Sequence, residues 1–226
     1  MSRPSRHPQP AVRLLSWDRA DELDLDGTAG RLDEAARDRL EASSEAEARR
    51  FLFGRALLVD TVAKTVGARR ITVTAHCPHC GLAHGRPQVL VDGGTVHASV
   101  SHTDGASAVA VSVTHAVGVD VERLDAARFA GVETVALSPT ERERWHRLPE
   151  QRRLRSLAEQ WTAKEAVTKA LGTGLATDPA TIDLTGRAEF TGHAGGTVAE
   201  IGGRRFVVDH PVLAPDTVVA TALLLA

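Results

Sequence analysis

One acidic pattern in this sequence has the residue types that phosphate chemistry needs. In VGVDVERL, alternate positions of an extended strand place Asp120 and Glu122 on one face and Val117, Val119 and Val121 on the other. Two carboxylates on one strand face can converge on a single cation. A sparse oxygen site of this kind suits Mg²⁺, which keeps waters and takes further ligands from phosphates. The same pattern also fits an edge strand with an acidic, solvated face.

A second pattern, WTAKEAVTKALGTGL, predicts a helix with acidic and basic side chains on one face. Residues four apart on a helix are neighbours, so Trp161, Glu165 and Lys169 form one row, with Lys164 beside it. An ordinary Glu–Lys pair would stabilise the helix by only about 0.2–0.5 kcal/mol. Alternatively, Glu165 completes the carboxylate set or acts as a base for a hydroxyl, while the lysines hold phosphate oxygens. Gly172 is the expected C-terminal end of the helix.

Two similar runs of elements would position these residues. The first half predicts helices over 33–67, then strands near QVLVDGG, VHASVSH, ASAVAVSV and VGVDVERL. The second half predicts helices over 139–171 and strands near TIDLTG, AEFTG, RRFVVDH and DTVVATALLL. The expected fold class is therefore α+β, as a duplicated unit, with residues 122–139 as the bridge between the halves.

Composition narrows the class of protein. The chain has 226 residues, of which 42% are hydrophobic, enough for one large core or two smaller ones. A net charge of -2 gives no reason to expect nucleic-acid binding. No stretch approaches the roughly 18 apolar residues of a membrane span. Because MSRPSRHPQP is polar and proline-rich without an apolar signal core, we expect a cytoplasmic protein.

The two cysteines lie together in HCPHCGLAHG. Two cysteines argue against a disulfide framework. Cys77 and Cys80 form a C-x-x-C pair with histidines nearby, which can hold a structural Zn²⁺. A single pair is a weak signal, so we expect a surface turn with reduced thiols and no zinc.

The two charged patterns together resemble a known family. GVDVERL and WTAKEAVTKALGTGL are similar to the signature motifs of 4′-phosphopantetheinyl transferases, G-[VI]-D-x-E and W-x-x-K-E-[AS]-x-x-K-x-x-G. ASVSHTDG and GRP resemble further features of the double-length, Sfp-type branch. This resemblance implies two similar α+β subdomains that form an intramolecular pseudo-dimer, and a monomeric protein. Residues 1–12 would be a disordered arm, and the active site would lie in the cleft between halves 13–118 and 119–226.

The resemblance also implies roles for individual residues. Asp120, Glu122 and Glu165 would hold Mg²⁺, or Mn²⁺, on the pyrophosphate of coenzyme A. Glu165 would also be the base for the accepting hydroxyl, and the catalytic residues Lys169 and His102 would contact the pyrophosphate. Further contacts with coenzyme A would come from Arg50, Arg86, Ser101 and Lys164, with Arg50 at the 3′-phosphate.

At two positions that would contact coenzyme A, the sequence departs from the pattern of the family. Among the basic residues of the helix before Arg50, only Arg37 fits a family position. Val59 stands where the branch often has an arginine.

The implied reaction transfers 4′-phosphopantetheine from coenzyme A to a serine of an apo acyl or peptidyl carrier protein. The products would be holo carrier protein and adenosine 3′,5′-bisphosphate. The partners would be acidic carrier domains, and residues 141–155, with six arginines, are either their docking face or a solvated helix. Two alternatives are a Mg²⁺-dependent phosphohydrolase that uses the same carboxylates and a non-catalytic paralogue that binds coenzyme A.

Overall fold

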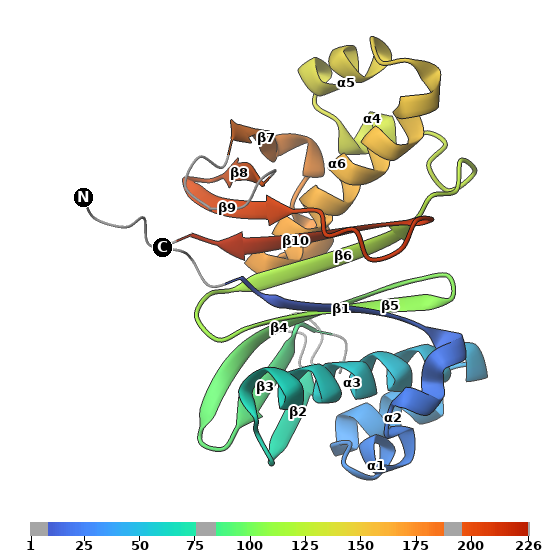
Figure 1. Ribbon diagram of the computed structural model, residues 1–226, viewed down its shortest axis with the longest axis vertical. Coiled ribbons are helices and arrows are strands. Elements are labelled where there is room, and N and C mark those ends of the chain that lie inside the picture. The colour runs from blue at the N-terminus through green and yellow to red at the C-terminus, as the bar shows by residue number, and fades with distance from the viewer. Residues whose placement is uncertain (1–8, 76–84, 188–195, 226) are drawn as a thin grey trace. The chain divides into compact units, whose positions relative to one another are not determined.

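The computed structural model describes residues 9–75, 85–187 and 196–225 and divides the chain into two compact units between Thr114 and His115. Each unit contains a five-stranded sheet and one helix of 22 residues that packs on it (Figure 1). All strand pairs among the described residues are antiparallel. The predicted α+β class with two similar subdomains is confirmed.

In the N-terminal unit, Pro10–Thr114, the first and last strands along the chain are neighbours in the sheet. The sheet order is β1-β5-β4-β3-β2. Its strands are β1 (Ala11–Ser16), β2 (Ile71–Ala75), β3 (Pro87–Val91), β4 (Gly94–Thr103) and β5 (Ala106–Ser112). Between β1 and β2 lie the helices η1 (Trp17–Glu22), α1 (Leu25–Gly30), α2 (Glu34–Ala42) and α3 (Glu45–Val66). The core forms where Phe53, Leu57 and Val62 of α3 pack with Val109 and Val111 of β5.

The ends of α3 are set by its sequence. The Ser44 side chain accepts a hydrogen bond from the Glu47 N–H, and the Glu47 carboxylate accepts one from the Ser44 N–H. Gly67 ends the helix in the left-handed region, with φ 67°. The helical prediction for 33–67 is therefore confirmed, with a break at Ser43 and Ser44.

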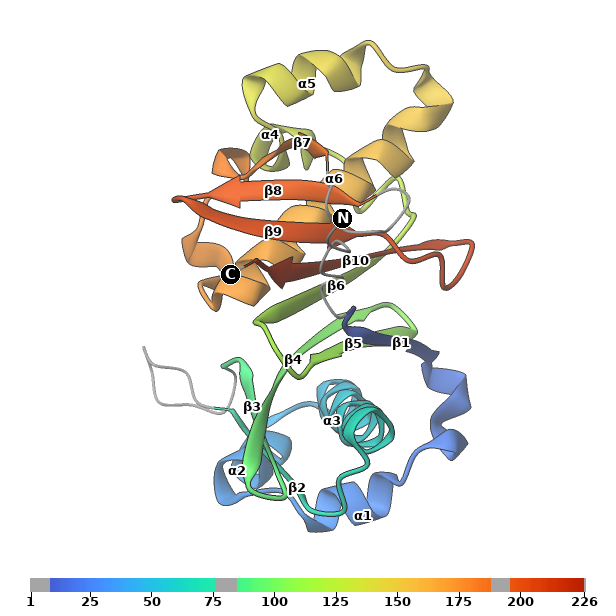
Figure 2. The ribbon, with the colours of Figure 1, turned by 60° about the vertical axis from the view of Figure 1, so that its left-hand side comes forward.

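The C-terminal unit repeats the same topology. Its strands are β6 (Val117–Arg123), β7 (Asp183–Arg187), β8 (Thr197–Ile201), β9 (Arg204–Asp209) and β10 (Thr217–Leu224). Its helices are α4 (Glu133–Ala136), α5 (Pro139–His146), α6 (Glu150–Leu171), η2 (Gly174–Ala176) and η3 (Pro179–Thr181). The sheet order β6-β10-β9-β8-β7 matches the first sheet strand for strand (Figure 2). In both units the last strand returns beside the first, so the duplication is confirmed.

Three parts of the predicted organisation are corrected by the structure. β1 begins at Ala11, inside the arm predicted for 1–12, because it pairs with β5; residues 1–8 lie outside the described residues. The strand at 117–123, expected in the first half, is hydrogen-bonded to β10 of the second sheet. The expected bridge over 122–139 belongs to the C-terminal unit, where Phe129, Ala136 and Leu137 pack against α6.

The sequence-based prediction missed three strands. It named no strand at β1, β2 or β8, each of which has only five or six residues. The strand expected at AEFTG lies outside the described residues. Within the described ranges, no helix combines the length and hydropathy that crossing a membrane requires.

Candidate functional site

A close approach between β6 and α6 builds the first group of candidate residues. A Cβ atom at Gly118 would lie 1.9 Å from the carbonyl oxygen of Ala166 and 2.7 Å from the backbone nitrogen of Ala170. Only glycine allows the helix to lie this close to the strand, which explains the glycine of the GVDVE pattern. Because side chains alternate along a strand, Asp120 and Glu122 share the face of Gly118 and lie toward α6.

Asp120, Glu122 and Glu165, which we call the acidic cluster, interact electrostatically. Asp120 is only 4% exposed and accepts a hydrogen bond from Lys169 Nζ at 2.6 Å. Burial and then the charge of Asp120 raise the pKa of Glu122, although Arg128 donates to Glu122 at 3.0 Å. Burial and then Asp120 also raise the pKa of Glu165, and Lys169 only partly offsets this. The structure therefore brings together four residues that the sequence singled out.

The donor set of the acidic cluster fits a divalent cation. Within the described ranges, no three His, Cys, Asp or Glu side chains already lie close enough to ligate one ion. However, Glu165 Oε1 is buried and has no hydrogen-bond partner among the described residues. Burying a carboxylate oxygen without a partner costs free energy, and a hard cation such as Mg²⁺ would supply the missing interaction.

Lys164 does not join the acidic cluster. Its side chain is fully buried, and Nζ donates to the Ala136 carbonyl at 2.7 Å and to Glu141 Oε2 at 2.6 Å. Glu141 also accepts from the Ser138 N–H at the start of α5. Lys164 therefore ties α4 and α5 to α6, and the structure gives it these internal contacts in place of an exposed, ligand-facing position.

A cavity of about 230 Å³ in the N-terminal unit, which we call the basic cavity, gathers the second group. Its lining comes from α2, α3, β4 and the segments around β2 and β3. The lining residues are Arg39, Phe51, Gly54, Arg55, Leu58, Ala75, Gly85, Pro87, Val100 and His102. The Arg39 and Arg55 guanidinium groups lie 4.5 and 5.2 Å from the centroid of the Phe51 ring.

The arginines around the basic cavity influence one another's charge. Burial and then Arg50 lower the pKa of Arg39. Burial is also the main cause that lowers the pKa of Arg55, and Arg39 adds to it. Burial lowers the pKa of Arg86, whose neighbours Gly85 and Pro87 line the cavity. Partly buried guanidinium groups that repel one another favour an anionic ligand such as a phosphate.

Sequence reasoning missed the arginines that line this cavity. Arg37, the residue it preferred, donates instead to the Leu32 carbonyl at 2.6 Å. Arg55 could have been found, because it lies four residues after Phe51 on the same face of α3. Arg39 belongs to a different helix, so only the tertiary fold brings it to the cavity.

The two neighbouring residues of β4 that the sequence singled out face different ways. The His102 ring packs against Gly54 of α3, where a Cβ atom would lie 2.3 Å from His102 Cε1. Ser101 is buried and, because side chains alternate along a strand, lies on the opposite face of the sheet. The structure therefore brings His102, and not Ser101, to the basic cavity.

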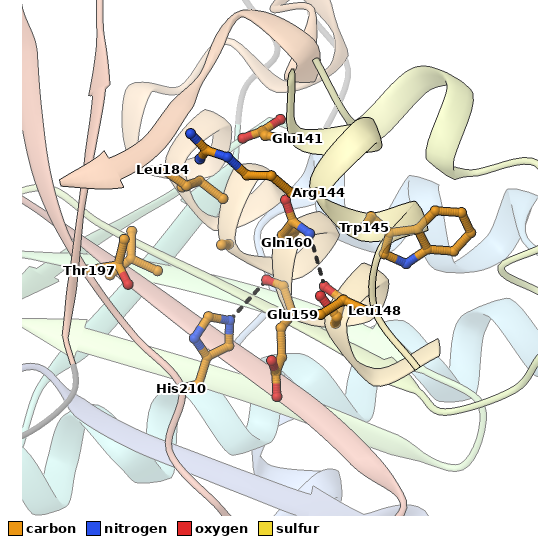
Figure 3. Close-up of a pocket in the computed structure, with 12 residues that line it drawn as sticks. Glu141, Arg144, Trp145, Leu148, Glu159, Gln160, Leu184, Thr197 and His210 are labelled. Atoms are coloured by element: carbon orange, nitrogen blue, oxygen red, sulfur yellow. Dashed lines mark hydrogen bonds between the residues drawn. The ribbon is translucent and has the colours of Figure 1, made fainter. Parts of the chain in front are cut away.

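A larger cavity, of about 670 Å³, lies in the C-terminal unit beside α5 and α6 (Figure 3). Arg144 and Trp145 of α5 both line this cavity (Figure 3). His210 Nε2 lies 2.9 Å from the Glu159 carbonyl at its edge. The cavity is lined in part by the arginine-rich segment 141–155 but by no member of the acidic cluster. Cys77 and Cys80 lie outside the described residues.

Comparisons with known proteins match the part of the chain that carries the acidic cluster. A profile of the 4′-phosphopantetheinyl transferase superfamily matches residues 116–206, which include β6 and α6. A holo-[acyl-carrier-protein] synthase of Streptococcus suis is 41% identical over 63 residues, which are 26% of this chain and 53% of that protein. The chain thus spans about half the length of this curated relative. Residues 116–206 are therefore similar to the 4′-phosphopantetheinyl transferase superfamily.

Solved structures are also similar to this chain, among them the following one. It is a holo-(acyl-carrier-protein) synthase of Bacillus anthracis in complex with CoA (3′,5′-ADP). It is 20% identical to this chain, with a TM-score of 0.39. The similarity covers 48% of this chain and 94% of the synthase chain. The assignment to the double-length, Sfp-type branch stays a prediction.

Proposed function

We propose that this protein transfers the 4′-phosphopantetheine group of coenzyme A to a serine of an apo carrier protein, releasing adenosine 3′,5′-bisphosphate. The observation that carries the proposal is the acidic cluster with Lys169 at the β6–α6 contact, inside the segment that the superfamily profile matches. The name of the Streptococcus suis relative, a holo-[acyl-carrier-protein] synthase, supports the same reaction class.

In this proposal the acidic cluster performs the chemistry. Asp120, Glu122 and Glu165 would hold Mg²⁺, with Mn²⁺ as a substitute, and the bound ion would neutralise charge on the pyrophosphate oxygens. Glu165 is suited to take the proton of the serine hydroxyl, because its raised pKa makes it a stronger base than an ordinary carboxylate. Lys169, held at Asp120, would offset charge on the leaving phosphate.

The basic cavity would bind phosphate groups of coenzyme A. Arg50 and Arg39 repel each other, and a bound 3′-phosphate would relieve that repulsion. His102 and Arg86 would contact other oxygens of the same ligand. The predicted pseudo-dimer, with its active site between the halves, is part of this proposal.

The carrier domain would dock on the arginine-rich segment 141–155. Arg144, Arg147, Arg152 and Arg155 of this segment are exposed. A group of exposed positive charges favours the binding of an acidic partner and raises its association rate.

The test is to incubate the protein with coenzyme A, Mg²⁺ and an apo carrier domain and then weigh the carrier. We expect the carrier to gain the mass of one phosphopantetheinyl group, with one adenosine 3′,5′-bisphosphate released per carrier. Cleavage of coenzyme A without a mass gain would show a phosphohydrolase. Binding of coenzyme A without cleavage would show a non-catalytic binding protein.

A further inference from the structure

Three side chains of the N-terminal unit form a hydrogen-bonded line that ends at the basic cavity. Ser107 of β5 is fully buried and pairs in register with His102 of β4. Trp17 follows β1, and its indole Nε1 donates to Ser107 Oγ at 3.0 Å. Ser107 Oγ in turn lies 2.7 Å from His102 Nδ1. The line therefore connects the segment after β1 to the β4–β5 hairpin, which lies about 90 residues further along the chain.

Counting protons along this line assigns the tautomer of His102. The indole N–H of Trp17 can only donate, so Ser107 Oγ is the acceptor of that bond. Ser107 keeps one hydroxyl proton, and among the described residues its only other hydrogen-bond partner is His102 Nδ1. Leaving a buried hydroxyl proton without an acceptor is costly, so Ser107 donates to Nδ1. A neutral His102 must then carry its proton on Nε2.

The contact between His102 and Gly54 shows which way the Nε2 edge of the ring faces. A Cβ atom at Gly54 would be 2.3 Å from His102 Cε1 and 3.0 Å from Nε2, so this edge of the ring lies against α3. Gly54 and His102 both line the basic cavity. Nε2 therefore lies on the edge of the ring that faces Gly54, another residue of the cavity lining.

We propose that Trp17 and Ser107 are positioning residues that hold His102 as the neutral Nε2–H tautomer, a hydrogen-bond donor to a phosphate oxygen in the basic cavity. A neutral donor can bind an anion there without adding a further cation beside Arg39 and Arg55. The assignment of the tautomer depends only on the hydrogen bonds among Trp17, Ser107 and His102. The identity of the ligand as coenzyme A rests on the proposed function.

The tautomer can be measured directly by NMR on the ligand-free full chain labelled with ¹⁵N-histidine. His102→Gln assigns the signal, and a long-range ¹H–¹⁵N spectrum at pH 8 distinguishes protonated from unprotonated ring nitrogens. We expect an unprotonated Nδ1 and a protonated Nε2. A protonated Nδ1, in either a neutral or a charged ring, would overturn the proposal, whether or not the protein transfers phosphopantetheine.

The functional role is tested with Ser107→Ala and with Ser112→Ala, a buried serine on the same strand, as the matched control. Ser107→Ala should add a second tautomer to the spectrum and raise KM for coenzyme A roughly 2- to 10-fold, the size of one ordinary hydrogen bond. Ser112→Ala should change neither. A mixed tautomer with an unchanged KM would show that Ser107 does not position His102 for the ligand. An inactive wild type would instead refute the proposed function and leave the NMR result standing.

Discussion

The two units place an acid and a lysine at matching positions of their long helices. The other charged side chains near that acid are basic in the N-terminal unit and mainly acidic in the C-terminal unit. Asp60 lies seven residues before the glycine that ends α3, and Glu165 lies seven residues before the glycine that ends α6. Lys64 and Lys169 each lie three residues before the same glycines. The difference between the units comes from the first strand of each sheet.

In the N-terminal unit the acid is neutralised. Asp60 accepts a hydrogen bond from Lys64 at 2.7 Å and pairs with Arg13 of β1. Burial alone would raise the pKa of Asp60, but the hydrogen bonds from Lys64 and Arg13 outweigh it and lower the pKa. One acid matched by two cations makes a local structural contact.

In the C-terminal unit the first strand contributes acids instead of an arginine. β6 supplies Asp120 and Glu122, and burial together with Asp120 raises the pKa of Glu165. Lys169 is shared with Asp120 and does not balance the cluster. The comparison teaches that the duplicated scaffold alone does not make a cation site, because the residues of the first strand decide its charge.

The largest expected effect concerns a buried ion pair that the N-terminal unit lacks. Lys164 pairs with Glu141, whereas Val59 occupies the matching position of α3. Lys164→Met should lower the free energy of unfolding by about 3–5 kcal/mol, because it leaves the buried Glu141 carboxylate without its cationic partner. Urea denaturation measures this.

The control for this pair is the double variant Lys164→Met with Glu141→Gln, which removes both charges and should recover part of the loss. Lys64→Met, at an exposed lysine, should cost less than about 1 kcal/mol. A loss of that small size in Lys164→Met would show that the pair does not hold α5 to α6.

The second prediction concerns turnover. Glu165→Gln should lower kcat for carrier modification by at least about 100-fold, because it removes both a ligand for the charge-neutralising cation and the base. Asp60→Asn, at the matching position, should stay within about 2-fold of the wild type, since the ion pairs of Asp60 with Lys64 and Arg13 lie outside the acidic cluster and removing them costs little. Equal rates for the two variants at saturating Mg²⁺ would contradict the assignment.

The third prediction concerns selection of coenzyme A by the basic cavity. Losing one charge-assisted contact costs about 1.5–3 kcal/mol, so Arg50→Ala should raise KM for coenzyme A roughly 10- to 150-fold. It should change KM for dephospho-coenzyme A much less, because that substrate lacks the 3′-phosphate. Steady-state kinetics with both substrates measures this, and equal weakening of the two would give Arg50 a structural role.

The smallest expected effect is a difference in pH dependence between the two matched acids. The pKa of Asp60 is lowered in the fold, so its stabilisation is present above its unfolded value of 3.8 and is lost as pH falls through the folded value. The pKa of Glu165 is raised, so its contribution is present below 4.5 and is lost as pH rises through the folded value.

Metal-free denaturation between about pH 2 and pH 8 covers both transitions and checks this difference. At pH 7, Asp60→Asn should be less stable than the wild type by about 0.2–1 kcal/mol. Glu165→Gln should be more stable than the wild type, because a buried charge among other acids is removed. A destabilised Glu165→Gln would mean that Glu165 has favourable partners beyond Lys169.

Local patterns predicted the residues that act within one segment or across one contact. Alternation put Asp120 and Glu122 on one strand face, and helical spacing put Glu165 and Lys169 in one row. Gly172 was predicted as the end of α6 and adopts the left-handed conformation there. Each of these depends only on neighbours in sequence, so the sequence carries the signal.

Features that depend on tertiary contacts could not be predicted. In the sequence, Lys164 cannot be distinguished from the other charged residues of its helix. Only the packing of α5 against α6 shows that it is buried with Glu141. Arg39 joins Arg55 at the Phe51 ring from a different helix, α2. Ser107 looks like an ordinary serine of an apolar strand, and its bonds to Trp17 and His102 appear only when three segments come together.

The most direct test of the difference between the units is metal binding without any substrate. Isothermal titration of Mg²⁺ into the wild type, Glu165→Gln and Asp60→Asn compares the two matched acids in one measurement. The account predicts that the wild type and Asp60→Asn each bind one ion with the same affinity and that Glu165→Gln loses this binding. Equal binding by all three proteins, or binding lost in Asp60→Asn alone, would contradict it.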